Sequence, residues 1–277
     1  MELNWLESIL YSVISGVSEF LPVSSKAHQG ILLNLFGCTA STALLDFCIH
    51  LGCLIAVYIQ CQSSVAAISR TSRLLSIPTH RRKRQPDRQL VAELRFLRTA
   101  AFPALLMIFL TAIVGSVSNR LNILAFVIIV NGIMLYITGH IPIGNKQSSA
   151  FNKLENILIG IASGLGIIPG ISRMGMTLSI STMRGTSTQN ALRLGLLLSI
   201  PVLVGLCIAD FVYIFISGAG ITGFLGFLQC IAGGGFAYIG AAFTITFMRF
   251  VAARTNFSWL SYYCWGLALF AFLLFMI

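Results

Sequence analysis

Two short polar stretches, far apart in the chain, interrupt segments that are otherwise as apolar as a membrane helix. The first reads SGVSEFLPVSSKAH (residues 15–28) and carries a Glu, a Pro, a Lys, a His and four serines. The second reads PGISRMGMT (residues 169–177) and carries an Arg. Charged groups at membrane depth cost about 2.5–3.5 kcal/mol each, so they usually mark function. The two stretches are therefore the leading candidates for a functional site.

The side chains in these stretches suit chemistry on phosphate esters. Arg173 offers a permanently charged, bidentate group for phosphoryl oxygens. Ser25 can act as a nucleophile or as a hydrogen-bonding ligand of phosphate, and His28, one helical turn away, can move a proton near neutral pH. Glu19 can hold a divalent ion that bridges phosphates, or act as a base. These four are the candidate catalytic residues, and Glu19 is the candidate metal ligand.

Further polar residues are candidates for binding the phosphates or for supporting the site. Ser24 and Ser172 also suit the capping of two half-helices, which we favour, and Lys26 equally suits snorkelling toward the membrane surface. Asp46 and His50 stand one helical turn apart and either face the same cavity or form hydrogen bonds between helices. The candidate phosphate-binding residues are Ser24, Lys26, Gly170, Ser172, Arg173 and Thr177. The residues assigned to the surroundings of the site are Ser15, Asp46 and His50.

The composition predicts which elements position these side chains. The chain has 277 residues, of which 57% are hydrophobic and only 9% are charged. A soluble domain averages about 25% charged residues. Apolar runs of roughly 20 residues, long enough to cross a bilayer as helices, recur along the chain. They lack the alternation expected of a transmembrane β-barrel. We therefore predict an all-α polytopic membrane protein.

Several other classes of site find no support in the sequence. No P-loop, Rossmann fingerprint, HExxH or GxSxG motif occurs. The seven cysteines form no CxxC pair, so they are interpreted as small packing residues rather than as a zinc or redox site. The acidic N-terminus does not look like a cleaved signal peptide. Asp210 and His140 fall near span ends and are predicted to lie at the membrane interface.

Six full spans and two broken segments are predicted. The predicted spans are residues 44–62, 99–117, 121–139, 189–211, 223–247 and 256–277. The broken segments, residues 5–36 and 155–185, are interrupted by Gly, Pro and Ser and are interpreted as re-entrant helical hairpins.

A basic loop over residues 63–98 orients these spans. Its basic residues are Arg70, Arg73, Arg81, Arg82, Lys83, Arg84, Arg88, Arg95 and Arg98. The positive-inside rule makes this loop cytoplasmic. Counting spans from it places Lys146, Lys153, Arg249 and Arg254 inside as well, residues 1–43 outside, and Arg120 in a short outer loop. The net charge of +10 therefore reports topology and anionic lipid headgroups rather than nucleic acid.

The two broken segments align with each other without gaps. ESILYSVISGVSEFLPVSS begins at Glu7, and ENILIGIASGLGIIPGISR begins at Glu155. The Glu, an Ile-Leu pair, a Ser-Gly pair and a late Ser match, and a Pro falls near the same place. Because the copies start on opposite sides of the membrane, we predict inverted repeats over residues 1–139 and 151–277 within one membrane domain. Such repeats can aim half-helix N-termini at an anion near the midplane.

GVSEFLPVSSKAH, followed later by PGISRMG, resembles the bacterial undecaprenyl-diphosphate phosphatase, or bacitracin-resistance, family. That family carries a pattern like E-G-x-[ST]-E-F-[LI]-P-[VI]-S-S-T-G-H in its first hairpin. Its second hairpin carries P-G-x-S-R-S-G-[AT]-T. LDFCIHLGCLIAV and LLLSIPVLVG also sit where the family has similar stretches, so the resemblance covers essentially the whole chain.

The resemblance implies an enzyme of the bacterial inner membrane. Such enzymes remove one phosphate from undecaprenyl diphosphate on the outer face, with a divalent cation (Mg²⁺ or Ca²⁺), and so recycle the lipid carrier for cell-wall synthesis. By position, Glu19 is the second acid of the paired-acid motif, Ser25 and His28 are its Ser and His, and Arg173 is the phosphate-binding Arg. Ser25 or a water attacks the phosphorus. The expected partners are the polyprenyl diphosphate and membrane lipids, with a homodimer left open.

The chain departs from the family pattern at four places, one of which is Met176, where the pattern has a small residue. Ser15 stands where the first acid is expected, Lys26 and Ala27 replace Thr-Gly, and Met174 replaces the Ser after the Arg. One metal ligand and one phosphate hydrogen bond are thereby absent, while Lys26 brings a charge that can offset a lost cation. The alternative hypothesis is a lipid-carrier transporter or flippase, or a catalytically impaired paralogue that binds polyprenyl phosphates.

Overall fold

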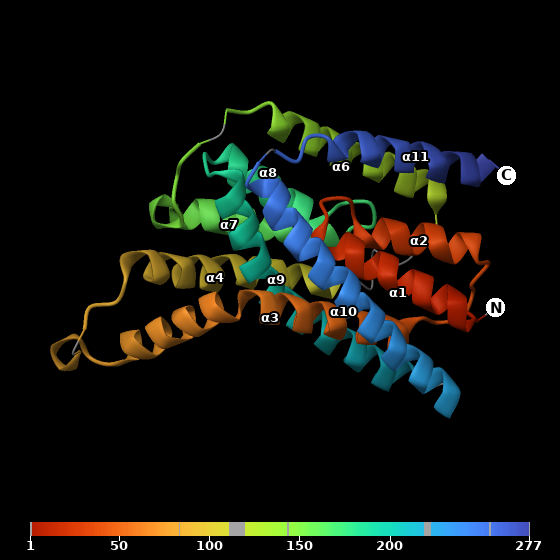
Figure 1. Ribbon diagram of the computed structural model, residues 1–277, viewed down its shortest axis with the longest axis horizontal. Helices are drawn as coiled ribbons and strands as arrows, with labels where there is room; N and C mark the ends of the chain where they lie inside the picture. Colours follow the sequence, from red (N-terminus) through yellow and green to blue (C-terminus); the bar gives the residue numbers. More distant parts are fainter. Residues whose placement is uncertain are drawn as a thin grey trace.

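The structure is a computed structural model that describes residues 2–82, 84–110, 120–142, 144–218, 223–254 and 256–276. Ten α-helices lie within these ranges, and most of them run along the long axis of the molecule (Figure 1). They are α1 (Trp5–Phe20), α2 (Ser25–Leu35), α3 (Ala43–Ser76), α4 (Arg88–Leu106), α6 (Leu121–Gly139), α7 (Lys153–Gly164), α8 (Arg173–Met183), α9 (Thr188–Ser217), α10 (Phe224–Ala252) and α11 (Leu260–Met276). Short 3₁₀ turns are η1 (Thr79–Arg81), η2 (Met107–Leu110), η4 (Ser148–Ala150) and η5 (Leu165–Ile167). The all-helical prediction is confirmed for the described residues.

Four helices are long and apolar enough to cross a membrane, namely α3, α6, α9 and α10. The α11 helix is also apolar but has only 17 residues. The span predicted over residues 99–117 falls across α4 and η2, and its residues 111–117 lie outside the described part of the chain. The chain is thus a multi-pass helical membrane protein, and the number of six crossings stays a prediction.

The basic segment over residues 63–98 is mostly helical, so its prediction as a loop was wrong. The α3 helix continues to Ser76, and α4 begins at Arg88 after an N-cap at Asp87. Hydropathy marks where a chain leaves the hydrocarbon, whereas Ala, Leu and Arg carry a helix beyond that point. Figure 1 shows the resulting α3–α4 arm protruding at the end of the molecule opposite the two termini. Lys83, one of its basic residues, lies outside the described residues.

The first helix of each broken segment begins in the same way. Asn4 caps α1 and Asn152 caps α7, and in both helices a Glu three residues later, Glu7 or Glu155, completes a capping box. Burial raises the pKa of Glu155, but hydrogen bonds from Lys146 and from the backbone of Asn152 lower that pKa to about 2. The matched glutamates therefore define where each hairpin starts.

Glycines let the first helix of each hairpin approach a helix of the other half. A Cβ on Gly16 of α1 would lie 2.3 Å from the carbonyl oxygen of Ala237 in α10. A Cβ on Gly164 of α7 would lie 2.5 Å from Cγ of Met107, which follows α4. Small residues at helix crossings are the usual means of close packing in membranes. The α1–α10 and α7–α4 contacts therefore tie the two halves of the chain together.

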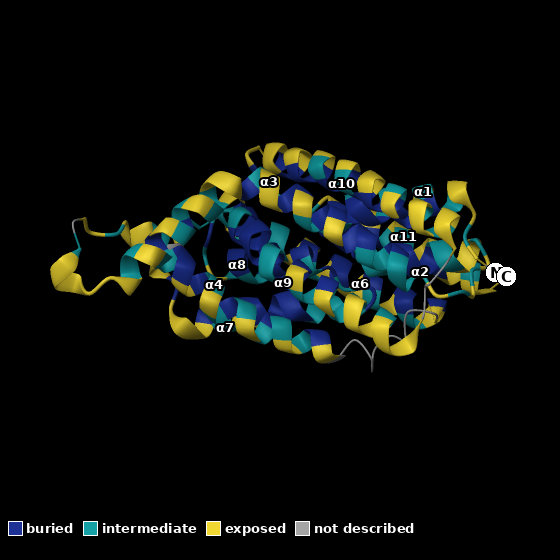
Figure 2. Ribbon diagram, turned by 90° about the horizontal axis from the view of Figure 1, so that it is seen from below, coloured by how far each residue is buried: buried dark blue, intermediate teal, exposed yellow. Residues whose placement is uncertain are grey.

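The outside of the bundle is apolar as well as the inside. Figure 2 shows buried residues gathered between the helices and exposed residues on their outer faces. Several of the exposed side chains are large and apolar, including Phe126, Phe215 and Phe243, which are 66%, 84% and 67% exposed. Many large apolar side chains exposed on the outside of a helical bundle are expected where the surface contacts lipid.

Serines cap the second helix of each hairpin and join the two breaks. Ser24 Oγ accepts from the backbone N–H of Ala27 in α2 at 3.3 Å and from that of Gly170 at 3.2 Å. Ser172 Oγ accepts from the N–H of Gly175 in α8 at 3.0 Å and donates to the carbonyl of Leu21 at 3.1 Å. The favoured capping role of both serines is confirmed. Each serine also bonds to the opposite hairpin, so the two breaks hold each other in place.

Asn131 of α6 completes this junction. It is 1% exposed, its Nδ2 donates to the carbonyl of Pro22 at 3.0 Å, and its Oδ1 accepts from the backbone N–H of Ser172 at 2.9 Å. One side chain thereby satisfies a polar backbone group in each break, which is required where water is excluded.

Replacing Asn131 with leucine is expected to destabilise the protein by about 2–4 kcal/mol, because two buried backbone groups lose their partner. The measurement is thermal unfolding of the purified protein in detergent, followed by near-UV circular dichroism. Asn122→Leu is the matched control, because Asn122 lies exposed on the same helix. Equal midpoints for the two variants would contradict a structural role for Asn131.

Candidate active site

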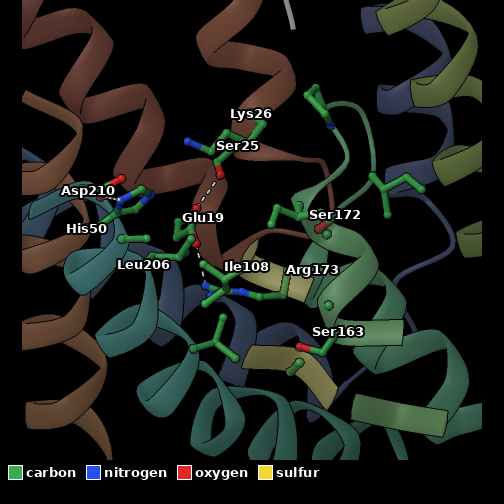
Figure 3. A pocket seen from close by; sticks show the side chains of 18 of the residues that line it. Glu19, Ser25, Lys26, His50, Ile108, Ser163, Ser172, Arg173, Leu206 and Asp210 are labelled. Carbon is green, nitrogen blue, oxygen red and sulfur yellow. Dashed lines mark hydrogen bonds and ion pairs between the residues drawn. The ribbon is translucent and has the colours of Figure 1, made fainter. Parts of the chain in front are cut away.

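A cavity of about 520 Å³ lies between the two broken hairpins (Figure 3). Polar side chains from both hairpins line it, and α3 and α9 close another side with His50 and Asp210. Apolar side chains, including Ile108, Val202 and Leu206, complete its wall. A mostly apolar cavity with a few convergent polar groups is typical of a ligand site.

Three side chains from the two hairpins form a continuous chain of contacts across the cavity. Ser25 Oγ, at the start of α2, donates to Oε2 of Glu19 near the end of α1. Arg173 Nη2, at the start of α8, donates to Oε1 of the same carboxylate at 2.5 Å. The side chains of Arg173 and Glu19 are only 9% and 10% exposed. This arrangement holds a hydroxyl, a carboxylate and a guanidinium together where the two charged side chains are mostly buried.

The guanidinium of Arg173 keeps unused donors. Its Nε and Nη1 are buried and have no hydrogen-bond partner in the described part of the chain. Buried polar groups in proteins are almost always paired, so an exception calls for a ligand or water. An anion with several oxygens, such as a phosphoryl group, could accept hydrogen bonds from these donors.

Ser25 and Arg173 occupy equivalent positions in the two broken hairpins. Ser25 and Arg173 are the first residues of α2 and α8, directly after the capping serines. The ungapped pairing of the two hairpins matches these two positions as well. Both helix N-termini therefore face the cavity, and their dipoles favour a negatively charged occupant.

A second polar group lies on the α3–α9 side of the cavity. His50 Nδ1 donates to Oδ2 of Asp210 at 2.6 Å, and both residues line the cavity. Lys26 of α2 lines it too, and Figure 3 shows its ammonium extending toward this pair. The cavity thus holds cations on two sides, Arg173 and Lys26. Of the residues assigned to the surroundings of the site, His50 is the one that reaches the cavity.

His28 does not line the cavity. Its ring stacks on Tyr263 of α11, and its Nδ1 donates to the carbonyl of Ser24 at 2.8 Å. Its Nε2 accepts from the hydroxyl of Tyr263 at 2.7 Å. Both ring nitrogens are therefore engaged between α2 and α11, and the proton-relay role of His28 stays a prediction that this geometry does not support.

Other predicted residues also lie outside the cavity lining. Thr177 Oγ1 donates to the carbonyl of Arg173, and the N–H of Gly170 is bonded to Ser24, so neither group is available to a phosphate. Asp46 accepts from Tyr11 of α1, which is the interhelical alternative considered for it, and from Thr42 at the start of its own helix. The six predicted residues that the structure brings into one cavity are Glu19, Ser25, Lys26, His50, Ser172 and Arg173.

Asp210 is the main cavity residue that the sequence analysis missed. It was predicted to lie at the membrane interface, but it is bonded to His50 inside the cavity. An acid within an apolar span is itself a signal of function, and it was available in the sequence. Ser18 and Ser163 line the cavity as well and were not singled out. The internal repeat offered a signal for Ser163, because Ser163 aligns with Ser15.

The donor set of the cavity does not fit a resident divalent cation. Both oxygens of Glu19 are engaged by Ser25 and Arg173, and Asp210 is bonded to His50. Ser15, at the position of the first motif acid, is outside the lining and accepts from Gln29. Among the described residues no group of three or more His, Cys, Asp or Glu could hold a metal ion. The divalent cation stays a prediction, and the described residues of the cavity do not support it.

Comparisons with known proteins cover nearly the whole chain. A family model described as "Bacitracin resistance protein BacA" matches residues 8–270. A protein of Carboxydothermus hydrogenoformans is 27% identical over 263 residues, which is 95% of this chain and 94% of that protein. A protein of Halothermothrix orenii is 28% identical over 262 residues, which is 93% of each chain. Both are named undecaprenyl-diphosphatase. A protein of Bacillus cereus named undecaprenyl-diphosphatase 3 is 26% identical over 271 residues, or 96% of each chain.

Proposed function

This chain belongs to the family of the bacitracin resistance protein BacA, and from that premise we propose that it hydrolyses undecaprenyl diphosphate to undecaprenyl phosphate and phosphate. The relatives that match it over nearly their full length are named for this activity. The chain is accordingly a membrane-bound hydrolase that acts on a polyprenyl diphosphate lipid. The reaction recycles the lipid carrier of cell-wall synthesis.

The observation that carries this proposal is the buried guanidinium of Arg173 beside the Ser25–Glu19 pair, with two nitrogens that no described residue pairs. The guanidinium binds the terminal phosphoryl group. The N-termini of α2 and α8 add positive potential at the same place. The apolar wall at Ile108, Val202 and Leu206 contacts the first isoprene units, and the rest of the tail lies in lipid.

Ser25 is the nucleophile in the proposed chemistry. Its Oγ attacks the terminal phosphorus while Glu19 takes the proton, and the bond from phosphorus to the bridging oxygen breaks. Glu19 passes this proton to the departing undecaprenyl phosphate. A water then attacks the phosphoserine and gives a proton to Glu19, which returns it to Ser25 Oγ as that bond breaks. Inorganic phosphate leaves, and no step passes through a metal ion or through His28.

The placement in the membrane is part of the proposal. We place the protein in the bacterial inner membrane, with the α3–α4 arm in the cytoplasm and the cavity accessible from the outer face. The arginines of the arm support this orientation through the positive-inside rule. The finer architecture is six crossings with two re-entrant hairpins in inverted repeats, for which the paired capping boxes and serine caps are the support. A homodimer stays a prediction.

Release of phosphate from undecaprenyl diphosphate by the purified protein in detergent tests the proposal. We expect one inorganic phosphate per lipid and undecaprenyl phosphate as the lipid product, identified by mass spectrometry. The assay is run with Mg²⁺, with Ca²⁺ and with EDTA. Silence in all three conditions would overturn the proposal and leave the lipid-carrier transporter as the hypothesis to pursue.

A further inference from the structure

We propose that Lys26 and Arg173 form a two-cation clamp for a diphosphate group, so that the cavity binds and turns over its lipid without a divalent cation. This inference rests on the proposed function and adds to it how the charge of the substrate is neutralised. Three features of the described residues carry it, namely the position of Lys26, its lack of a partner and the poor donor set for a metal.

Lys26 presents a free charge to the cavity. It is the second residue of α2, next to Ser25, and it lines the same cavity as Arg173. Within the described ranges its ammonium forms no ion pair and no hydrogen bond, although it lies close enough to Asp210 to interact electrostatically. The carboxylate of Asp210 is already bonded to His50, so the ammonium remains available. A half-buried, unpaired cation beside a nucleophile is suited to a second phosphoryl group.

Arg173 and Lys26 extend from different elements toward one space. Arg173 comes from α8, in the second hairpin, and Lys26 from α2, in the first (Figure 3). Ser25 directly precedes Lys26 in the sequence, and Ser25 and Arg173 both donate hydrogen bonds to Glu19. A diphosphate has two phosphoryl groups, and this arrangement offers one cation to each. Arg173 holds the group that is attacked, and Lys26 holds the group that leaves.

The same residues explain why a metal is not needed. The carboxylates that would bind a cation are engaged, as Glu19 is by Arg173 and Asp210 is by His50. Relative to the family pattern described above, Ser15 removes one negative charge when that acid is Glu, and Lys26 adds one positive charge. Together these departures raise the charge of the motif by two, which is the charge that a divalent cation supplies.

Hydrolysis with and without chelation tests the inference first. The natural chain is expected to keep its rate within about 3-fold when EDTA replaces Mg²⁺, whereas Lys26→Gln loses about 10- to 100-fold in EDTA, the worth of one charge-assisted contact. Lys26→Arg keeps the charge and is expected to be more active in EDTA than Lys26→Gln. Lys153→Gln is the matched control, because Lys153 is exposed at the start of α7 and outside the cavity.

Binding of methylenediphosphonate, a diphosphate analogue that cannot be hydrolysed, separates this inference from the proposed function. Titration calorimetry in EDTA is expected to show binding to the natural chain and to Lys153→Gln, and binding at least about 10-fold weaker to Lys26→Gln. This result without any hydrolysis would sink the proposed function and keep the clamp. A natural chain that binds or hydrolyses only with Mg²⁺, or Lys26→Gln equal to the natural chain in EDTA, would overturn the clamp.

Discussion

Arg173→Ala is expected to lower kcat/KM for phosphate release from undecaprenyl diphosphate by about 10³-fold or more, the effect of removing a main stabiliser of phosphoryl charge. Two nitrogens of the buried guanidinium have no hydrogen-bond partner among the described residues, and its third nitrogen pairs with Glu19 beside Ser25. Its removal therefore takes away the phosphate clamp and disturbs the base at once. Steady-state phosphate release by equal amounts of folded protein is the measurement.

Two further variants make the Arg173 result specific. Arg173→Lys keeps the charge but loses the bidentate geometry, so we expect an activity between those of alanine and arginine. Arg120→Ala should leave the rate unchanged, because Arg120 is exposed at the start of α6 and outside the cavity. Full activity of Arg173→Ala would contradict the proposed site, and equal losses in Arg173→Ala and Arg120→Ala would indicate a non-specific effect of charge.

Ser25→Ala is expected to lower kcat by about 10⁴-fold or more, as for other nucleophiles that act as a unit with their base. The reason is that Ser25 Oγ is hydrogen-bonded to Glu19, which can take its proton during attack. If a water attacked directly, Ser25 would contribute one hydrogen bond, and its loss would cost only about 10-fold. The size of the effect therefore distinguishes the two nucleophiles that the sequence left open.

A trapping experiment checks the same prediction independently. Substrate with a radiolabelled terminal phosphate, quenched in acid during turnover, should leave label on the natural chain at Ser25 and none on Ser25→Ala. Ser63→Ala, a change at an exposed serine of α3 outside the cavity, should label like the natural chain. If the natural chain releases phosphate but carries no label, a water molecule attacks the phosphorus directly.

Local signals in the sequence were sufficient for the helices and for their interruptions. The α6 helix has the predicted bounds, Leu121–Gly139, because its apolar run ends where polar residues begin. Ser24 and Ser172 were predicted to cap half-helices and do so. The helix ends that differ most are those of the α3–α4 arm, where hydropathy falls before the helix stops. The helices α9 and α10 also continue to Ser217 and Ala252, beyond the predicted ends at 211 and 247. Apolarity and capping act over a few neighbouring residues, so they can be read from the chain alone.

For the residues that start a half-helix, the sequence alone also predicted which polar side chains enter the site. Ser25, Lys26 and Arg173 occupy the first turns after the two breaks, and the N-terminus of each half-helix faces the opposite hairpin. Glu19 precedes the first break by less than one turn. Their proximity follows from the repeat and the serine caps, without knowledge of how the other helices pack.

Only the tertiary structure decided the partners of side chains on helix faces. His28 is hydrogen-bonded to Tyr263, which is 235 residues away, and His50 is hydrogen-bonded to Asp210, which is 160 residues away. Spacing along a helix specifies the face on which a residue lies, but it does not specify which helix covers that face. That choice depends on close packing at positions such as Gly16 against Ala237, where the whole bundle must fit together at once.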